Sequence, residues 1–187
     1  MSPLRSFIAL PTPDSVKNRI ANTQAELKQL NADVKWDSPE KFHITLKFLG
    51  NIELQVLEKL TADLEAIATH HPAFELVFHS VGAFPSITQP RVLWAGTIQN
   101  DVLLSLQRRV EETCARFNFP KEQRAFHPHI TLGRVKGTRN IGRLTDKLKS
   151  ITLEATNSRC TELLVMRSHL HPSGSVYSVV NSIPFKP

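Results

Sequence analysis

The chain alternates between two kinds of hydrophobic pattern. Four stretches carry apolar residues three or four positions apart, which is the spacing of one face of a helix. These stretches are marked by Val16, Ile20, Leu27 and Leu30, by Leu57, Leu60, Leu64 and Ile67, by Leu103, Leu106, Val110, Cys114 and Phe117, and by Ile141, Leu144 and Leu148. We expect Pro72 and Pro120 to end the second and third helices, because proline cannot continue a helix.

Short apolar or alternating runs between the helices predict β-strands. They lie at 5–10, 41–50, 74–84, 91–98, 129–132, 151–157, 161–169 and 175–180. Gly50 is expected to close the second strand, and Gly133 to lie just beyond the fifth. This mixture of helices and strands predicts an α+β fold, in which each half of the chain contains one motif-bearing strand followed by a helix.

Two of the predicted strands share the tetrapeptide HITL, at residues 43–46 and again at 129–132. Successive side chains of a strand point to opposite faces, so the Ile and Leu of each copy are expected to face the core. The His and Thr of each copy then face the other way. If the two halves are related by an approximate two-fold axis, both His–Thr pairs meet in one cleft.

Two histidines and two threonines around one cleft suit a displacement reaction at phosphorus. An imidazole titrates at about pH 6.5, so one of His43 and His129 can take a proton from water while the other gives a proton to the departing oxygen. The hydroxyls of Thr45 and Thr131 can donate hydrogen bonds to the non-bridging oxygens. Arg134, just after the second copy, adds a cation that can bind two oxygens. Such a reaction needs no metal and no covalent nucleophile.

Charge is unevenly distributed along the chain. The net charge is +6, and residues 108–149 alone hold 11 Lys and Arg against four acidic residues. A basic segment of this kind favours anionic partners such as phosphates or RNA. Cys114 and Cys160 form no CxxC pair, which fits reduced thiols in a cytoplasm. The apolar run near the start is too short for a signal peptide and no run is long enough to span a bilayer, so we expect a cytoplasmic protein with no membrane contact.

Other chemistry is less well supported by the sequence. The pairs His127–His129 and His169–His171 have the spacing of a metal-binding HxH pair, but neither has an obvious third ligand. The remaining histidines are interpreted as surface or structural residues. The chain has no GxxxxGK[ST], GxGxxG, GxSxG or HExxH motif, so no ATP, nucleotide cofactor or metal is expected.

Taken together, these residues resemble a known family. The matching segments are RSFIAL at 5–10, FHITLKFLG at 42–50, RVLWAG at 91–96, FHPHITLGR at 126–134 and ELLVMRSHLHPSGSVYSVV at 162–180. Paired HxTx motifs in this setting are similar to those of the two-histidine phosphoesterase superfamily. Within it, the chain resembles the RNA 2′,3′-cyclic phosphodiesterase branch, which is also called the 2′-5′ RNA ligase family.

The resemblance implies one bilobed domain over residues 1–187. Its two antiparallel sheets are related by a pseudo-two-fold axis, with flanking helices and a central cleft. It also implies metal-independent hydrolysis of RNA 2′,3′-cyclic phosphate ends to 2′-phosphates, and in some members the joining of RNA ends through a 2′-5′ bond. By motif, His43 corresponds to the general acid, His129 to the general base, and Thr45, Thr131 and Arg134 to phosphate-binding residues.

Several alternatives stay open at this point. The chain could be a non-catalytic module that binds RNA ends or nucleotides, or a metal-dependent hydrolase that uses His127 and His129. Its substrate could also be a small cyclic nucleotide or a 2′-5′ oligonucleotide. Phe48 and Phe126 are candidates for stacking on a base, although both are equally expected as core aromatics. We expect a monomer in which segment 108–149 holds the RNA backbone.

Overall fold

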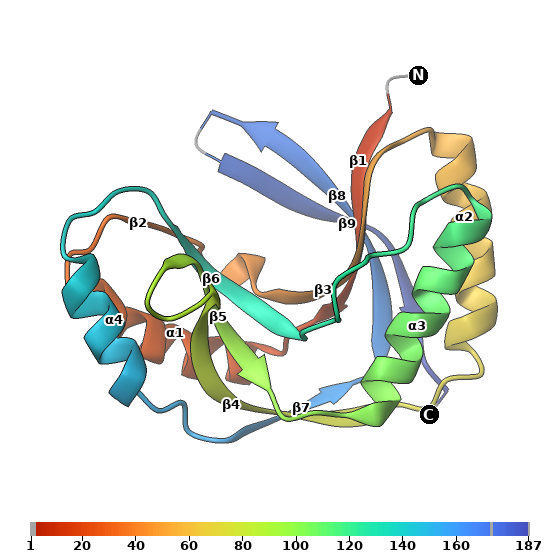
Figure 1. Ribbon diagram of the computed structural model, residues 1–187. Coiled ribbons are helices and arrows are strands. Elements are labelled where there is room, and N and C mark those ends of the chain that lie inside the picture. The colour runs from red at the N-terminus through yellow and green to blue at the C-terminus, as the bar shows by residue number, and fades with distance from the viewer. Residues whose placement is uncertain (1–2, 173, 187) are drawn as a thin grey trace.

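The computed structural model describes residues 3–172 and 174–186 and has an α+β fold, as predicted (Figure 1). The helices are α1 (Asp14–Lys28), α2 (Leu54–Ala68), α3 (Asp101–Arg116) and α4 (Ile141–Ser150), with a 3₁₀ turn at Pro39–Lys41. The strands are β1 (Leu4–Pro11), β2 (Val34–Trp36), β3 (His43–Ile52), β4 (Phe74–Pro85), β5 (Pro90–Thr97), β6 (His129–Val135), β7 (Thr156–Cys160), β8 (Glu162–His171) and β9 (Gly174–Pro184).

The two strands that carry HITL, β3 and β6, are neighbours in the middle of the sheet. Its order is β7-β4-β5-β6-β3-β1-β8-β9, and β2 pairs with β6 outside this path. All the paired strands are antiparallel, and β3 meets β6 through a single residue pair, Ile44 with Ile130. Each half therefore has four strands in equivalent order, namely β3-β1-β8-β9 and β6-β5-β4-β7. The two sheets expected from the resemblance are joined into one at that single pair.

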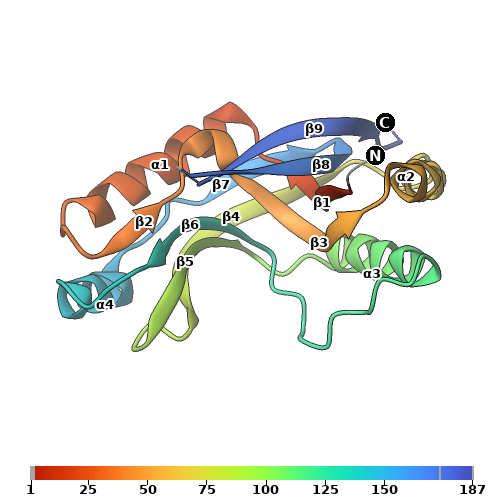
Figure 2. The same cartoon turned by 90° about the horizontal axis from the view of Figure 1, so that it is seen from above.

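The helices divide between the two halves. Helices α2 and α3 pack against each other and against the half that contains β3, whereas α1 and α4 lie beside the other half (Figures 1 and 2). Buried aliphatic side chains such as Ile8, Leu60 and Leu106 fill the space between helices and sheet. A second, smaller apolar cluster covers the opposite face of β1 and β8 and consists of Phe7, Ala9, Leu164 and Met166.

Most of the predicted elements are confirmed, and the differences have local causes. Gly50 does not end β3, because its positive φ of 66° accommodates an irregular register with β1 and the strand continues to Ile52. Gly133 likewise lies inside β6. Strand β7 begins only at Thr156, so the first part of the predicted run at 151–157 is not strand. Strand β2 was not predicted from the sequence.

A buried ion pair connects β3 with the segment that precedes β6. Lys47 donates to the Glu111 carboxylate of α3 at 2.7 Å and to the carbonyl of Pro120 at 2.6 Å. Both side chains are at least 90% buried. The same carboxylate accepts a hydrogen bond from the backbone N–H of Glu122 at 3.3 Å. Residues 120–122 are thereby held against the strand that carries the first HITL motif.

Both cysteines are buried inside the fold, and burial raises the pKa of the Cys114 and Cys160 thiols to about 12. At neutral pH they are therefore thiols rather than thiolates, and the thiol is the less nucleophilic form. No helix within the described residues is long and apolar enough to cross a membrane.

Candidate active site

The two HITL motifs meet where the halves of the sheet join. The pair Ile44–Ile130 is flanked by His43 and Thr131 on one side and by Thr45 and His129 on the other, because the strands are antiparallel. Ile44 and Leu46 of the first copy, and Ile130 and Leu132 of the second, are buried in the core. The histidines and threonines are only partly buried and face away from it. The predicted division of faces is confirmed.

Hydrogen bonds to the backbone orient both imidazoles in the same way. Nδ1 of His43 lies 2.6 Å from the carbonyl oxygen of Lys41, and Nδ1 of His129 lies 2.6 Å from that of His127. A carbonyl oxygen can only accept, so each Nδ1 carries the hydrogen and Nε2 is left to exchange protons. Nε2 of His43 is also 3.1 Å from the hydroxyl of Thr45.

Aromatic side chains support both histidines. The ring of His43 stacks on Phe7 of β1 at 4.9 Å and meets the edge of Tyr177 of β9 at 5.3 Å. On the other side, His129 meets Phe84 of β4 edge-on at 5.0 Å. Each imidazole is thus confined between its backbone hydrogen bond and an aromatic surface. Neither Tyr177 nor Phe84 carries a sequence signal that connects it with a histidine far away in the chain.

The two histidines have different charged neighbours. Burial lowers the pKa of both. For His43 the hydrogen bond to Lys41 and the carboxylate of Asp37 oppose this shift and His129 adds to it, so the pKa stays below its ordinary value. For His129 the hydrogen bond to His127 also raises the pKa, but the nearby His127 and Arg134 lower it. A negative neighbour favours the protonated form and positive neighbours favour the neutral form. Among the groups that act on the two imidazoles, the carboxylate of Asp37 acts on His43 and the guanidinium of Arg134 acts on His129.

Asp37, which sequence reasoning missed, is positioned by a buried glutamine. The backbone N–H of Asp37 donates to the carbonyl of Leu132 at 2.9 Å. The side-chain amide of Gln24, on α1, donates to the carbonyls of Asp37 and Leu132 at 2.7 and 2.8 Å. Gln24 is 1% exposed, so its replacement would leave both carbonyls without this donor.

Arg134 and Phe48 occupy equivalent places in the two halves. Leu46 in β3 and Leu132 in β6 each lack a partner in the neighbouring strand, so both strands bulge just after the threonine. Phe48 and Arg134 follow two residues later, and both are exposed. Phe48 is 69% exposed and so is not a core aromatic, whereas Phe126 packs partly buried against the main core.

The metal-binding alternative lacks a third ligand. His127 and His129 have ring centroids 6.4 Å apart. Within residues 3–172 and 174–186, no group of three or more His, Cys, Asp or Glu side chains is arranged to hold a metal ion. His169 and His171 are exposed on β8, and the buried His71 packs between Phe74 and Phe185 as a structural residue.

Comparison with known proteins places this arrangement among phosphoesterases. The family described as LigT-like phosphoesterase matches residues 10–94 and 98–177. An RNA 2′,3′-cyclic phosphodiesterase of Methanothermobacter thermautotrophicus is 30% identical, with 94% of this chain and 95% of that protein covered. Another, from Archaeoglobus fulgidus, is 31% identical, with 93% and 96% covered. The crystal structure of Escherichia coli LigT with 3′-AMP has the same fold, with a TM-score of 0.81, 22% identity and 99% of each chain covered.

Proposed function

Because the chain belongs to the LigT-like phosphoesterase family, we propose that it hydrolyses RNA 2′,3′-cyclic phosphate ends to 2′-phosphates by general acid–base catalysis. The observation that carries the proposal is the pair of histidines whose Nδ1 atoms are held in the same way, with an acidic neighbour, Asp37, acting on His43 and a basic neighbour, Arg134, acting on His129. A base and an acid of matched geometry are what an in-line displacement at phosphorus requires.

The proposed reaction uses only side chains of this chain. Nε2 of neutral His129 takes a proton from water, and the water oxygen forms a bond to phosphorus. The bond from phosphorus to the 3′-oxygen breaks, and protonated His43 gives its proton to that oxygen. The hydroxyls of Thr45 and Thr131 and the guanidinium of Arg134 stabilise the charge on the non-bridging oxygens. The product is a 2′-phosphate beside a free 3′-hydroxyl.

A short RNA with a 2′,3′-cyclic phosphate end, incubated with the protein and excess EDTA, tests the reaction. We expect complete conversion to the 2′-phosphate, because no step uses a metal. A 3′-phosphate product would keep the histidine pair but reverse the choice of leaving oxygen. Activity lost in EDTA and restored by zinc would favour the metal-dependent alternative. Unchanged RNA that still binds would point to a non-catalytic module.

The rate is expected to depend on pH as a bell-shaped curve. The acid limb reports the base, His129, and the alkaline limb reports the acid, His43. Asp37 raises the pKa of His43, so Asp37→Asn should move the alkaline limb to lower pH. The acid limb should stay in place, and the variant should lose most of its rate above neutral pH. Initial rates between pH 5 and 9, under conditions where chemistry is rate-limiting, measure both limbs.

Glu40→Gln is the matched control for the pH experiment. Glu40 is an exposed carboxylate three residues from Asp37, and it is not among the groups that shift the pKa of His43. The control should leave both limbs unchanged. An Asp37→Asn profile that coincides with that of the unmodified protein would remove Asp37 from the proposal.

A further inference from the structure

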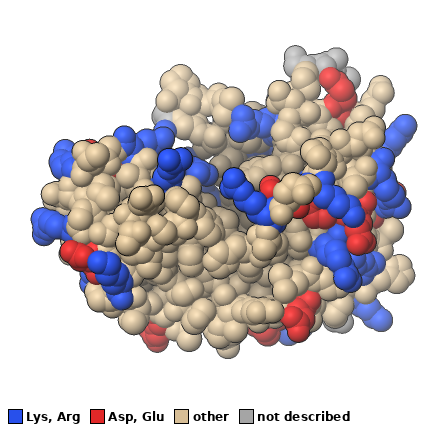
Figure 3. Space-filling view, in the orientation of Figure 1, with Lys and Arg blue, Asp and Glu red and all other residues tan. Residues whose placement is uncertain are grey.

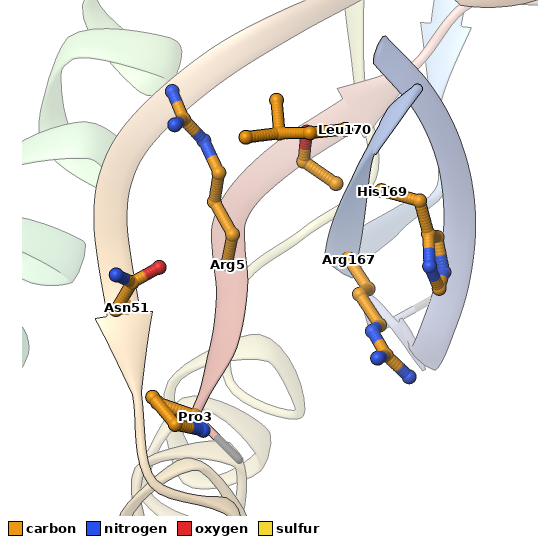
Figure 4. A pocket seen from close by; sticks show the side chains of 7 residues that line it. Pro3, Arg5, Asn51, Arg167, His169 and Leu170 are labelled. Atoms are coloured by element: carbon orange, nitrogen blue, oxygen red, sulfur yellow. The ribbon is translucent and has the colours of Figure 1, made fainter. Parts of the chain in front are cut away.

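A cavity of about 360 Å³ lies at the beginning of β1, away from the two HITL motifs. Its lining includes Arg5 of β1, Asn51 of β3, and Ser168 and Leu170 of β8 (Figure 4). We propose that this cavity binds a phosphodiester group of the RNA upstream of the cyclic end, with the Arg5 guanidinium as its cation. The inference rests on the proposed function, because it extends that substrate beyond its terminal nucleotide.

One face of the sheet leads from the catalytic pair to this cavity. Phe7 stacks on His43, and across the strand pair Phe7 lies opposite Phe48, with ring centroids 6.0 Å apart. Arg5 comes two residues before Phe7 and pairs with Asn51. Residues two apart on a strand share a face, so Arg5 continues the row that starts beneath the catalytic acid. An RNA chain leaving the cleft along β1 meets the aromatic rings first and the cation second.

The Arg5 side chain is available for a ligand. It is exposed, and no described carboxylate lies within ion-pair distance of its guanidinium. In Figure 4 it extends from β1 toward β3, whereas Arg167 points away on the far side of β8.

The apolar rim of the cavity suits a nucleotide rather than a free inorganic anion. Leu170, which lines the cavity, is 71% exposed, and Phe48, which lies beside Phe7 between the cavity and His43, is 69% exposed. Single-stranded nucleic acids bind where cations that hold phosphates alternate with aromatic faces on which bases stack. Figure 3 shows a hollow below the β8–β9 hairpin, with Lys and Arg side chains on both its sides.

The basic segment at 108–149 is less free to bind than its charge suggests. Arg116, Arg139, Lys147 and Lys149 form ion pairs with Asp63, Asp33, Glu26 and Asp146 respectively. These ion pairs involve four of the eleven basic residues of the segment. Arg134 is the member of the segment that acts on His129. Arg5 is the stronger candidate for the next phosphate because it shares a strand face with Phe7, which stacks on His43.

The test compares two substrates that differ only in length. One is a nucleoside 2′,3′-cyclic phosphate, and the other is a trinucleotide with the same cyclic end. Arg5→Gln should raise KM for the trinucleotide roughly tenfold, as expected for the loss of a charge-assisted contact. It should leave kcat unchanged and leave the mononucleotide reaction unaffected. For the trinucleotide, log(kcat/KM) decreases with log[salt]. In Arg5→Gln the slope of this decrease should be shallower by about 0.7, the value for one phosphate contact on a single strand.

Arg159→Gln is the matched control, since Arg159 is an exposed arginine on β7, at the opposite end of the sheet order. It should change neither substrate's kinetics. An equal effect of Arg5→Gln on both substrates, or no effect on either, would overturn the upstream site while leaving the proposed function intact. If the unmodified protein hydrolysed neither substrate, the proposed function would fail and the upstream site with it.

Discussion

His129→Ala is expected to reduce turnover of an RNA 2′,3′-cyclic phosphate by about 10²–10⁴-fold, the usual contribution of a positioned acid or base. His43→Ala should cost a similar factor. Both rings face away from the main core, so the variants should fold normally. Single-turnover rates give the effect on the chemical step, and thermal unfolding curves check that the fold is retained.

The roles of the two histidines can be separated by the leaving group. The 3′-oxygen leaves as a poor alkoxide unless it is protonated, whereas p-nitrophenolate leaves without help. A phosphodiester with a p-nitrophenyl group should therefore restore much of the activity of His43→Ala and none of that of His129→Ala. The reverse result would exchange the two roles. Near-full turnover of the RNA substrate by either variant would remove that histidine from the mechanism.

Lys47→Ala is expected to lower the free energy of unfolding by about 3–5 kcal/mol, because it leaves the buried carboxylate of Glu111 without its cation. The carbonyl of Pro120 also loses its donor. Residues 120–122 precede the second HITL motif, so activity should fall together with stability. Urea unfolding at pH 7 measures the change in free energy.

Two further variants separate the buried pair from a general effect of charge. Lys47→Met combined with Glu111→Leu removes both charges and keeps the volume, and should recover most of the stability lost in Lys47→Ala. Lys149→Ala breaks the exposed pair with Asp146 and should leave the urea midpoint nearly unchanged. A double variant as unstable as Lys47→Ala would indicate that packing, not the unpaired charge, is responsible.

The sequence predicted the elements whose pattern is local. The repeated HITL motif predicted which residues face the core and which face away from it, because side chains alternate between the two faces of a strand. Strand β2 was missed because its three residues are too few to display a period. Gly50 and Gly133 were expected at strand ends, but in these strands the neighbouring hydrogen bonds continue through the irregular register.

The residues that surround the two histidines could not be predicted from the sequence. Asp37 acts on His43 only because Gln24 and Leu132 hold it beside β6. Phe7 and Tyr177 come from opposite ends of the chain, and only the order of the strands puts them under one imidazole. Such contacts depend on tertiary pairing, and no pattern along the chain signals them. The difference in charged neighbours between the two histidines therefore required the structure.

The order of the strands in the sheet also limits when each part of the protein can fold during synthesis on the ribosome. Strand β1 lies between β3 and β8, and Phe7 pairs with Met166 far along the chain. Strand β1 is synthesised early, yet one of its edges stays open until β8 has emerged. Pairings this distant in sequence form slowly, because a long loop must close first. Phe7 and Tyr177, which pack on the proposed catalytic acid His43, are thus among the last residues to reach their final positions. A nascent chain should therefore become active only after the β8–β9 hairpin has paired with β1.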